Sequence, residues 1–391
     1  MRKLLIVMLL SACIEPYEFE AADYDEVLVV DGLLTDEDKF HYVTLSKTFP
    51  LDGSASKFVT NANVSVESEG GERYDYFHTG NGVYQPSASF AGRIGERYRV
   101  LIDIEDKNYV SIFNELIASP EIDSIYAKYE SVFGDGVDEN SYGLQFYVDA
   151  HDPTGKAQYF RYQYEETYVL RAPYPADYVW LGGNEYAPRP FDEQVSTCYL
   201  TDTSTQVLYT TSNGNVEQRV AEFPLRFIAE TGKEMRQKYT MNLFQYAIDQ
   251  NAFSYFKNLK SNNESKGSLF DQQPGAVPGN IVGPNNELVL GYFTVAGVST
   301  KRDWFLPSDF TPEGFRLQSN DRNCTDEMVQ IIDFDTLGYF MSSGEAIYDI
   351  FNVVPTFPPP PPDVTPGIYV SIKTCTRCTH LATNMKPEFW E

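Results

Sequence analysis

Alternation of aromatic and polar side chains limits most strongly how this chain can fold. Within the segment 144–174, one strand face carries aromatic rings and the other carries polar groups: Phe160, Tyr162, Tyr164 and Tyr168 against Arg161, Gln163, Glu165 and Thr167. A period of two is the period of a half-buried β-strand. The chain has 28 Tyr and 26 Phe, and aromatic residues favour pleated surfaces. The sequence therefore predicts a mostly β protein.

Short strands separated by turn signals predict a small β-sandwich over residues 27–112. Candidate strands cover 27–35 and 41–49, and a Gly-Gly pair is placed to close a hairpin over 62–77. Strands that recur at this spacing are typical of sandwiches. We expect an immunoglobulin-like or transthyretin-like domain here, resembling the β-sandwich modules of carboxypeptidase-regulatory type.

Residues 113–391 predict a larger antiparallel β domain with one short helix. Asp249 can cap that helix, whose apolar positions recur at helical spacing as far as about Lys260. A polyproline insertion lies near 355–367, with five consecutive prolines at 358–362. Such a run favours an extended helix. It could serve as an exposed spacer or as a docking ligand for a partner.

The first 26 residues indicate export and lipid attachment. Two basic residues precede a short apolar run, which is too short to span a bilayer but typical of a signal peptide. The run ends in Leu-Ser-Ala followed by Cys13, which matches the bacterial lipobox. We therefore expect a lipoprotein signal peptide at 1–12, a lipidated Cys13 and an acidic tether at 13–26. The alternative is an ordinary signal peptide that happens to contain a cysteine.

The net charge of −26 argues against nucleic acid as a partner and against flat adhesion to anionic lipid. Acyl chains anchor through their buried methylene groups instead. The expected arrangement is a soluble body held at the membrane only by its lipid anchor.

Lipidation of Cys13 would leave four cysteines, and an exported protein with four cysteines is expected to form disulfides. The candidates are Cys198, Cys324, Cys375 and Cys378. One member of the Cys375/Cys378 pair could bond Cys324, because these positions could flank one long loop. A local 375–378 bridge with a separate 198–324 bridge is the alternative.

No motif in the chain indicates catalysis. The nucleophile elbow, the zinc-protease motif, the phosphate-binding loop and the dinucleotide fingerprint are all missing from the sequence. His41 and His78, two of the four histidines, lie in or beside predicted strands, where structural roles are commoner. We predict no catalytic residues, no metal ligands and no cofactor.

Aromatic residues in an irregular segment are the best candidates for ligand or partner contacts. They are Tyr174, Tyr178, Trp180 and Tyr186, interleaved with Pro175 and a Gly-Gly pair. Tyr and Trp combine large apolar area with a polar group, which suits them to binding surfaces. Packing of this loop onto its own domain is the alternative.

Several segments together resemble one family. They are CIEPYE, LVVDGLLTDE, VTLSKTFP, FSYFKNLKSNNESKGSLFDQQPGAVPGNI, LGYFTVAG and CTRCTHLATNMKPEFW. In this order they resemble the Bacteroidota lipoproteins catalogued as the Domain of Unknown Function 4249 family, from Cys13 to Trp390. The proline run is an elaboration of this chain.

This resemblance implies an outer-membrane lipoprotein, with a TonB-dependent transporter or another large outer-membrane complex as partner. It supplies no catalytic residues. It also associates the acids after Cys13 (Glu15, Glu18 and Glu20) with export to the cell surface, although a plain solvated linker is the alternative. We therefore expect a non-enzymatic accessory subunit of a β-barrel complex at the cell exterior. The alternative function is capture of glycans or peptides as nutrients.

Overall fold

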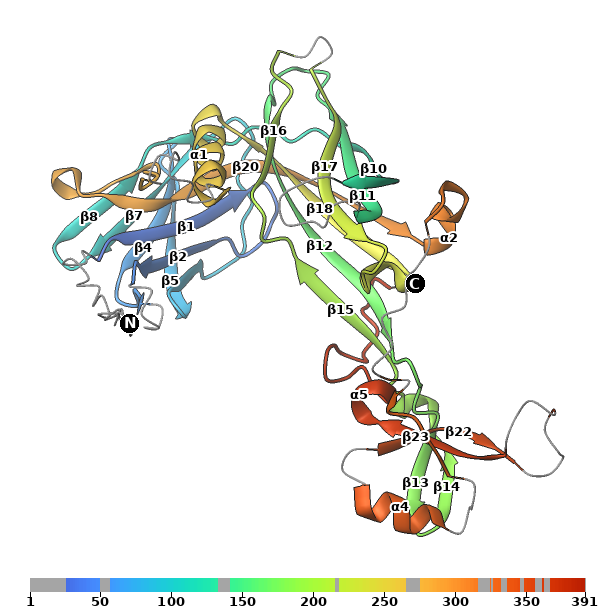
Figure 1. The fold of residues 1–391 in the computed structure, drawn as a ribbon. Coiled ribbons are helices and arrows are strands. Elements are labelled where there is room, and N and C mark those ends of the chain that lie inside the picture. Colours follow the sequence, from blue (N-terminus) through green and yellow to red (C-terminus); the bar gives the residue numbers. More distant parts are fainter. Residues whose placement is uncertain are drawn as a thin grey trace, which may run out of the picture.

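The computed structural model describes residues 26–49, 57–132, 141–214, 218–264, 275–315, 324, 326–331, 336–344, 348–355, 361 and 366–390. Cys13, almost all of the predicted tether and most of the polyproline run lie outside these residues. Within them, no helix is long and apolar enough to cross a membrane. The chain is mostly β, as predicted, and its sheets pack face to face in a sandwich-like manner (Figure 1).

The first part of the chain forms a sandwich around a hydrophobic core that is rich in aliphatic residues. Its strands follow one another in the sheet as β1-β2-β6-β5-β4-β7-β8. They are β1 (Leu28–Thr35), β2 (Tyr42–Lys47), β4 (Asn63–Ser68), β5 (Arg73–Gly80), β6 (Val83–Pro86), β7 (Arg97–Ile104) and β8 (Lys107–Ser111), with short β3 (Lys57–Phe58) and β9 (Asn114–Glu115) alongside. Alternate residues such as Val64, Val66, Val100 and Ile102 are buried between the faces. The predicted hairpin is β4–β5, and Gly71 takes the positive φ (95°) that its turn requires.

The second sandwich consists of two sheets packed face to face. One is a separate sheet, and the other continues the sheet that contains β1. Its strands are β10 (Ile122–Val132), β11 (Ser141–His151) and β17 (Arg219–Ala229) on one side, and β12 (Tyr159–Arg171), β15 (Thr197–Thr203), β16 (Leu208–Thr211) and β18 (Tyr239–Ile248) on the other. The predicted aromatic face of β12 is buried in the core between them. The burial of Phe160 and Tyr162, each 1% exposed, confirms that part of the pattern.

Strand β20 (Val289–Phe305) joins the two sandwiches. Its first half pairs in parallel with β1, and its second half pairs antiparallel with β18. Within the described residues, fifteen strands therefore form one sheet that runs from β15 to β19 (Ile281–Val282). The domain boundary predicted at residue 112 lies between β8 and β9, and the division of the chain there stays a prediction.

Helix α1 (Gln250–Glu264) covers the region where the sandwiches meet (Figure 1). The carboxylate of Asp249 accepts a hydrogen bond of 2.7 Å from the Ala252 amide, so Asp249 caps the helix as expected. Other helical segments are too short for a periodic signal: α2 (Pro307–Phe310), α4 (Leu337–Gly344), α5 (Lys373–Thr376) and the 3-10 turns η1 (Phe191–Glu193), η2 (Glu234–Arg236), η3 (Pro284–Asn286) and η4 (Thr311–Glu313).

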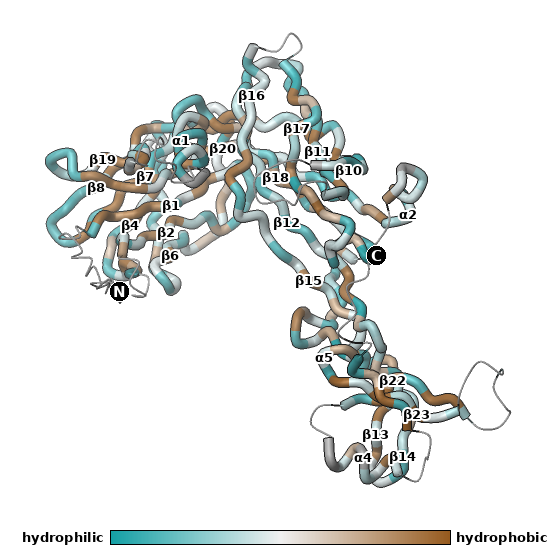
Figure 2. The backbone as a smooth tube through the Cα atoms, viewed as in Figure 1, coloured by the Kyte–Doolittle hydropathy of each residue, from teal (hydrophilic) through white to brown (hydrophobic). Residues whose placement is uncertain are grey.

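A third unit, which we call the distal module, projects beyond the far end of β12 and β15 (Figure 1). It consists of the hairpin β13 (Tyr178–Gly182) and β14 (Glu185–Pro188), the sheet β21 (Val329–Ile331), β22 (Tyr348–Val354) and β23 (Gly367–Ile372), and helices α4 and α5. Its own core contains Ile331, Leu337, Met341, Ile350, Ile368 and Val370. Figure 2 shows these hydrophobic segments apart from those of the body.

His41 is a buried structural histidine in the first sandwich. Its Nδ1 accepts a hydrogen bond from the Thr35 amide (3.4 Å), and its Nε2 donates to the carbonyl oxygen of Phe90 (2.8 Å). This pairing requires the neutral ring with its proton on Nε2. Burial lowers the pKa of His41 to about 4 and outweighs the opposing bond to Phe90.

We expect His41 to make the protein less stable as the pH falls from 6.5 to 4. The folded-state pKa lies below the unfolded value, so in this window the unfolded chain binds the proton preferentially. The full loss corresponds to about 3 kcal/mol. Urea unfolding across this range should show that the free energy of unfolding depends less on pH for His41→Gln than for the wild type. The variant lacks the His41 contribution, and the carboxylates contribute equally to both proteins. Identical pH slopes for the two proteins would contradict this.

Candidate functional site

The four aromatic residues singled out in the sequence lie in or beside the distal module. Tyr178 and Tyr186 face each other across the β13–β14 hairpin, with ring centroids 5.9 Å apart. Trp180 donates its indole N–H to the carbonyl oxygen of Gly183 (2.8 Å), and Tyr174 stacks on Phe351 at 4.7 Å. Tyr178, Trp180 and Tyr186 pack partly buried against the module's core. Their packing role is therefore visible in the fold, while their contact with a ligand or partner stays a prediction.

Two disulfides secure the distal module, and one of them ties it to strand β15 of the body. Cys198 of β15 bonds Cys378 with a Cα–Cα distance of 5.8 Å, and Cys324 bonds Cys375 at 5.6 Å. The bond between Cys324 and Cys375 agrees with the sequence-based expectation that one cysteine of the 375/378 pair bonds Cys324. The alternative, a 375–378 bridge with a 198–324 bridge, does not form. The partner of Cys198 was open in the sequence, because residues 180 positions apart can meet only through the tertiary fold.

A buried ionic cluster holds the hairpin against the rest of the module. Asp349 accepts two hydrogen bonds of 2.6 Å from the Arg377 guanidinium and one of 2.8 Å from the Thr376 hydroxyl. The Arg189 guanidinium lies 4.0 Å from the same carboxylate and donates to the carbonyl of Ala176 (2.7 Å). The hydrogen-bonded Asp349 raises the pKa of Arg377, while burial lowers the pKa of Arg189. A cavity of about 180 Å³ opens beside this cluster, with Tyr178 and Trp180 in its wall.

The tip of the distal module exposes large apolar side chains. Leu181 lies in the hairpin and is 61% exposed, and Tyr339 lies in α4 and is 84% exposed. The Gly338 amide donates to the side chain of Asn184 (2.8 Å), which places the start of α4 against the hairpin turn. The β13–β14 hairpin and α4, which carry these side chains, lie at the end of the module farthest from the body (Figure 1). We call Leu181 and Tyr339 the tip patch. The sequence offered no signal for it, because exposure depends on which strands and helices pack together.

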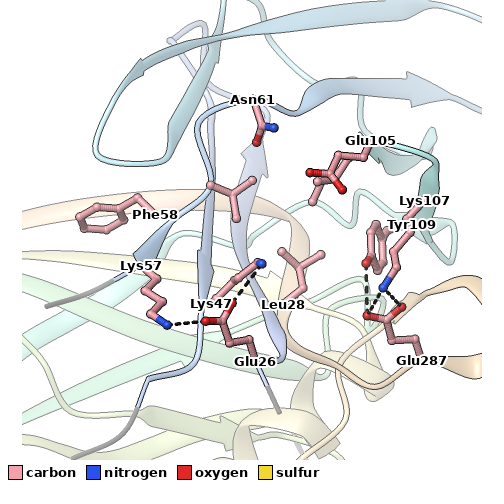
Figure 3. Close-up of a pocket in the computed structure, with 12 residues that line it drawn as sticks. Glu26, Leu28, Lys47, Lys57, Phe58, Asn61, Glu105, Lys107, Tyr109 and Glu287 are labelled. Carbon is pink, nitrogen blue, oxygen red and sulfur yellow. Dashed lines mark hydrogen bonds and ion pairs between the residues drawn. The ribbon is translucent and has the colours of Figure 1, made fainter. Parts of the chain in front are cut away.

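A different cavity, of about 340 Å³, lies at the end of the first sandwich where β1 begins (Figure 3). Glu26, the first described residue after most of the predicted tether, forms ion pairs with Lys47 (3.2 Å) and Lys57. Lys107 pairs with Glu287 at 2.8 Å on the opposite wall. The cavity's cations are already paired with carboxylates. The ion pairs of Glu26 hold the start of β1 against the first sandwich. Since the lysines of this cavity already have carboxylate partners, they are poor candidates for binding an anionic ligand.

No group of three or more metal-ligating side chains gathers among the residues that the structure describes.

A family model described as "Domain of unknown function (DUF4249)" matches residues 14–302. The match includes both sandwiches as far as β20 and the β13–β14 hairpin, and it ends before β21, α4, β22 and β23. No curated protein matches the chain.

Proposed function

The chain belongs to the family described as Domain of unknown function (DUF4249), and we propose that it is a non-enzymatic accessory subunit of an outer-membrane β-barrel complex. In this proposal, lipid on Cys13 anchors the protein in the outer membrane, facing the cell exterior. The distal module contacts the barrel, which is a TonB-dependent transporter or another large outer-membrane protein.

The tip patch is the observation that carries this proposal. Large exposed apolar side chains at one place on a surface mark sites of protein–protein contact. Here Leu181 and Tyr339 are exposed on β13 and α4, the elements at the end of the projecting module (Figure 1). Two disulfides and the Asp349 cluster stabilise that module. A rigid support of this kind reduces the entropy that is lost when a surface binds a partner.

We expect native purification of the tagged protein to recover a large β-barrel protein. Changing both residues of the tip patch, Leu181→Ser with Tyr339→Ser, should reduce the recovered partner by about tenfold or more, because apolar anchors at an interface dominate its affinity. Phe77→Ser is the matched control, since Phe77 is 57% exposed on β5 of the first sandwich. It should leave recovery unchanged.

Recovery of the wild-type protein alone and monomeric would contradict the proposal. A partner that is retained equally by the tip variant and the wild type would contradict the role of the tip patch. Recovery without a barrel but with a bound oligosaccharide or peptide would favour the alternative function of nutrient capture. The cavity beside Tyr178 and Trp180 is the feature that favours this alternative.

A further inference from the structure

A separate cavity of about 280 Å³ lies where the two sandwiches meet, and we call it the junction cavity. Strands β1, β12 and β20, the loop between β15 and β16, and helix α1 all contribute to its wall. The residues that matter for its chemistry are Asp31, Arg161, Tyr255, Phe256, Gly291 and Tyr292. The junction cavity is distinct from the distal module, so a ligand bound there is independent of the proposed function.

Two opposite charges line the junction cavity without pairing with each other. In the part of the chain that the structure describes, neither the Asp31 carboxylate nor the Arg161 guanidinium makes an ion pair within 4.0 Å or a side-chain hydrogen bond. The Arg161 guanidinium instead lies over the rings of Phe256 (4.7 Å) and Tyr246 (5.8 Å). These rings hold the Arg161 head in place by cation–π attraction.

Asp31 is exposed to solvent at the cavity wall. Neighbouring residues still raise the pKa of its carboxyl by desolvation, and the nearby positive charge of Arg161 offsets this only partly. A ligand ammonium would give this carboxylate the direct ion-pair partner that it lacks among the described residues.

Aromatic rings from α1 and β20 form part of the remaining wall of the junction cavity, alongside aliphatic and polar side chains of β1, β12 and the loop before β16. Tyr255 of α1 lies 4.9 Å from Tyr292 of β20, and Phe256 lies 6.2 Å from it, between ring centroids. The Tyr292 hydroxyl is buried and has no hydrogen-bond partner among the described residues. Gly291 keeps the β1–β20 contact close: its φ is +87°, and a Cβ there would stand 1.9 Å from the Val30 carbonyl oxygen. A side chain at this position would push the two strands apart.

We propose that the junction cavity binds a free α-amino acid with an apolar or aromatic side chain, its carboxylate on Arg161 and its ammonium on Asp31. A simple anion would meet the like charge of Asp31, and a simple cation would meet that of Arg161. A neutral sugar would leave both charges without a counter-charge. The volume of about 280 Å³ lies just below the usual range of ligand pockets, which suits a ligand this small.

Calorimetric titration of the purified full chain with L-phenylalanine tests the proposal. The two matched probes are N-acetyl-L-phenylalanine, which lacks the ammonium, and L-phenylalaninamide, which lacks the carboxylate. We expect millimolar or tighter binding of L-phenylalanine. Each derivative should bind about tenfold or more weakly, because each leaves one charged group of the cavity unpaired.

Variants assign each charge to its half of the ligand. Asp31→Asn should remove the preference for L-phenylalanine over its N-acetyl derivative, and Arg161→Gln should remove the preference over the amide. Glu105→Gln, in the cavity of Figure 3, is the control and should change neither preference. Thermal melting of each variant verifies folding. The absence of measurable binding, equal binding of the three probes, or wild-type preferences in both variants would each overturn the proposal.

Discussion

Replacing Cys198 and Cys378 with alanine is expected to lower the free energy of unfolding by about 5 kcal/mol in the chain-entropy model, and measured losses for native disulfides span about 2–5 kcal/mol. The bridge joins residues 180 positions apart. Cutting it therefore returns a large amount of conformational freedom to the unfolded chain. Both cysteines are buried, and alanine introduces no charge in their place.

The second bridge supplies the matched comparison. Cys324 and Cys375 are separated by 51 positions, and their removal should cost about 4 kcal/mol on the same model. Guanidinium unfolding followed by tryptophan fluorescence measures both variants. Trp180 reports on the distal module, while Trp304 and Trp390, 4.9 Å apart between ring centroids, report on the body. Unchanged unfolding midpoints after loss of Cys198 and Cys378 would show that this bridge does not hold the module in place.

Asp349→Asn should destabilise the distal module by about 3–5 kcal/mol, the usual cost of removing one partner from a buried ion pair. The substitution keeps the shape of the side chain but leaves the guanidinium of Arg377 without its carboxylate. The Arg189 side chain, only 9% exposed, loses its nearest negative charge as well. The fluorescence transition of Trp180 should move to lower denaturant, and that of Trp304 and Trp390 should move less.

Asp75→Asn is the control for Asp349. Asp75 pairs with Arg73 at 3.1 Å, and both side chains are more than half exposed. Exposed pairs contribute about 0–1 kcal/mol because water and salt screen them. If Asp349→Asn changes stability no more than Asp75→Asn does, the buried cluster has no structural role.

Local sequence patterns were sufficient for many individual elements. The period of two placed the aromatic face of β12 in the core, the Gly-Gly pair closed the β4–β5 hairpin, and Asp249 began helix α1. Each of these depends on residues within a few positions of one another. Backbone geometry and hydrogen bonds to near neighbours decide them, so they can be read from the order of the residues.

The candidate sites could be predicted only in part. The aromatic segment around Trp180 was recognisable by composition, but its packing against β22 and α4 requires residues more than 150 positions further along the chain. The sequence did not predict the junction cavity, because nothing local brings Asp31 of one segment to Arg161 of another. Strand alternation placed Arg161 on the face opposite the core, without showing what lay across from it.

The sequence alone thus determines a β-rich chain with identifiable strands, turns and one capped helix, together with cysteines that need partners. The tertiary structure decides the parallel pairing of β1 with β20, the bridge from Cys198 to Cys378 and the meeting of Asp31 with Arg161. The reason is physical. Long-range contacts depend on the packing of whole sheets and on the entropy of closing long loops, and neither is encoded in a short segment.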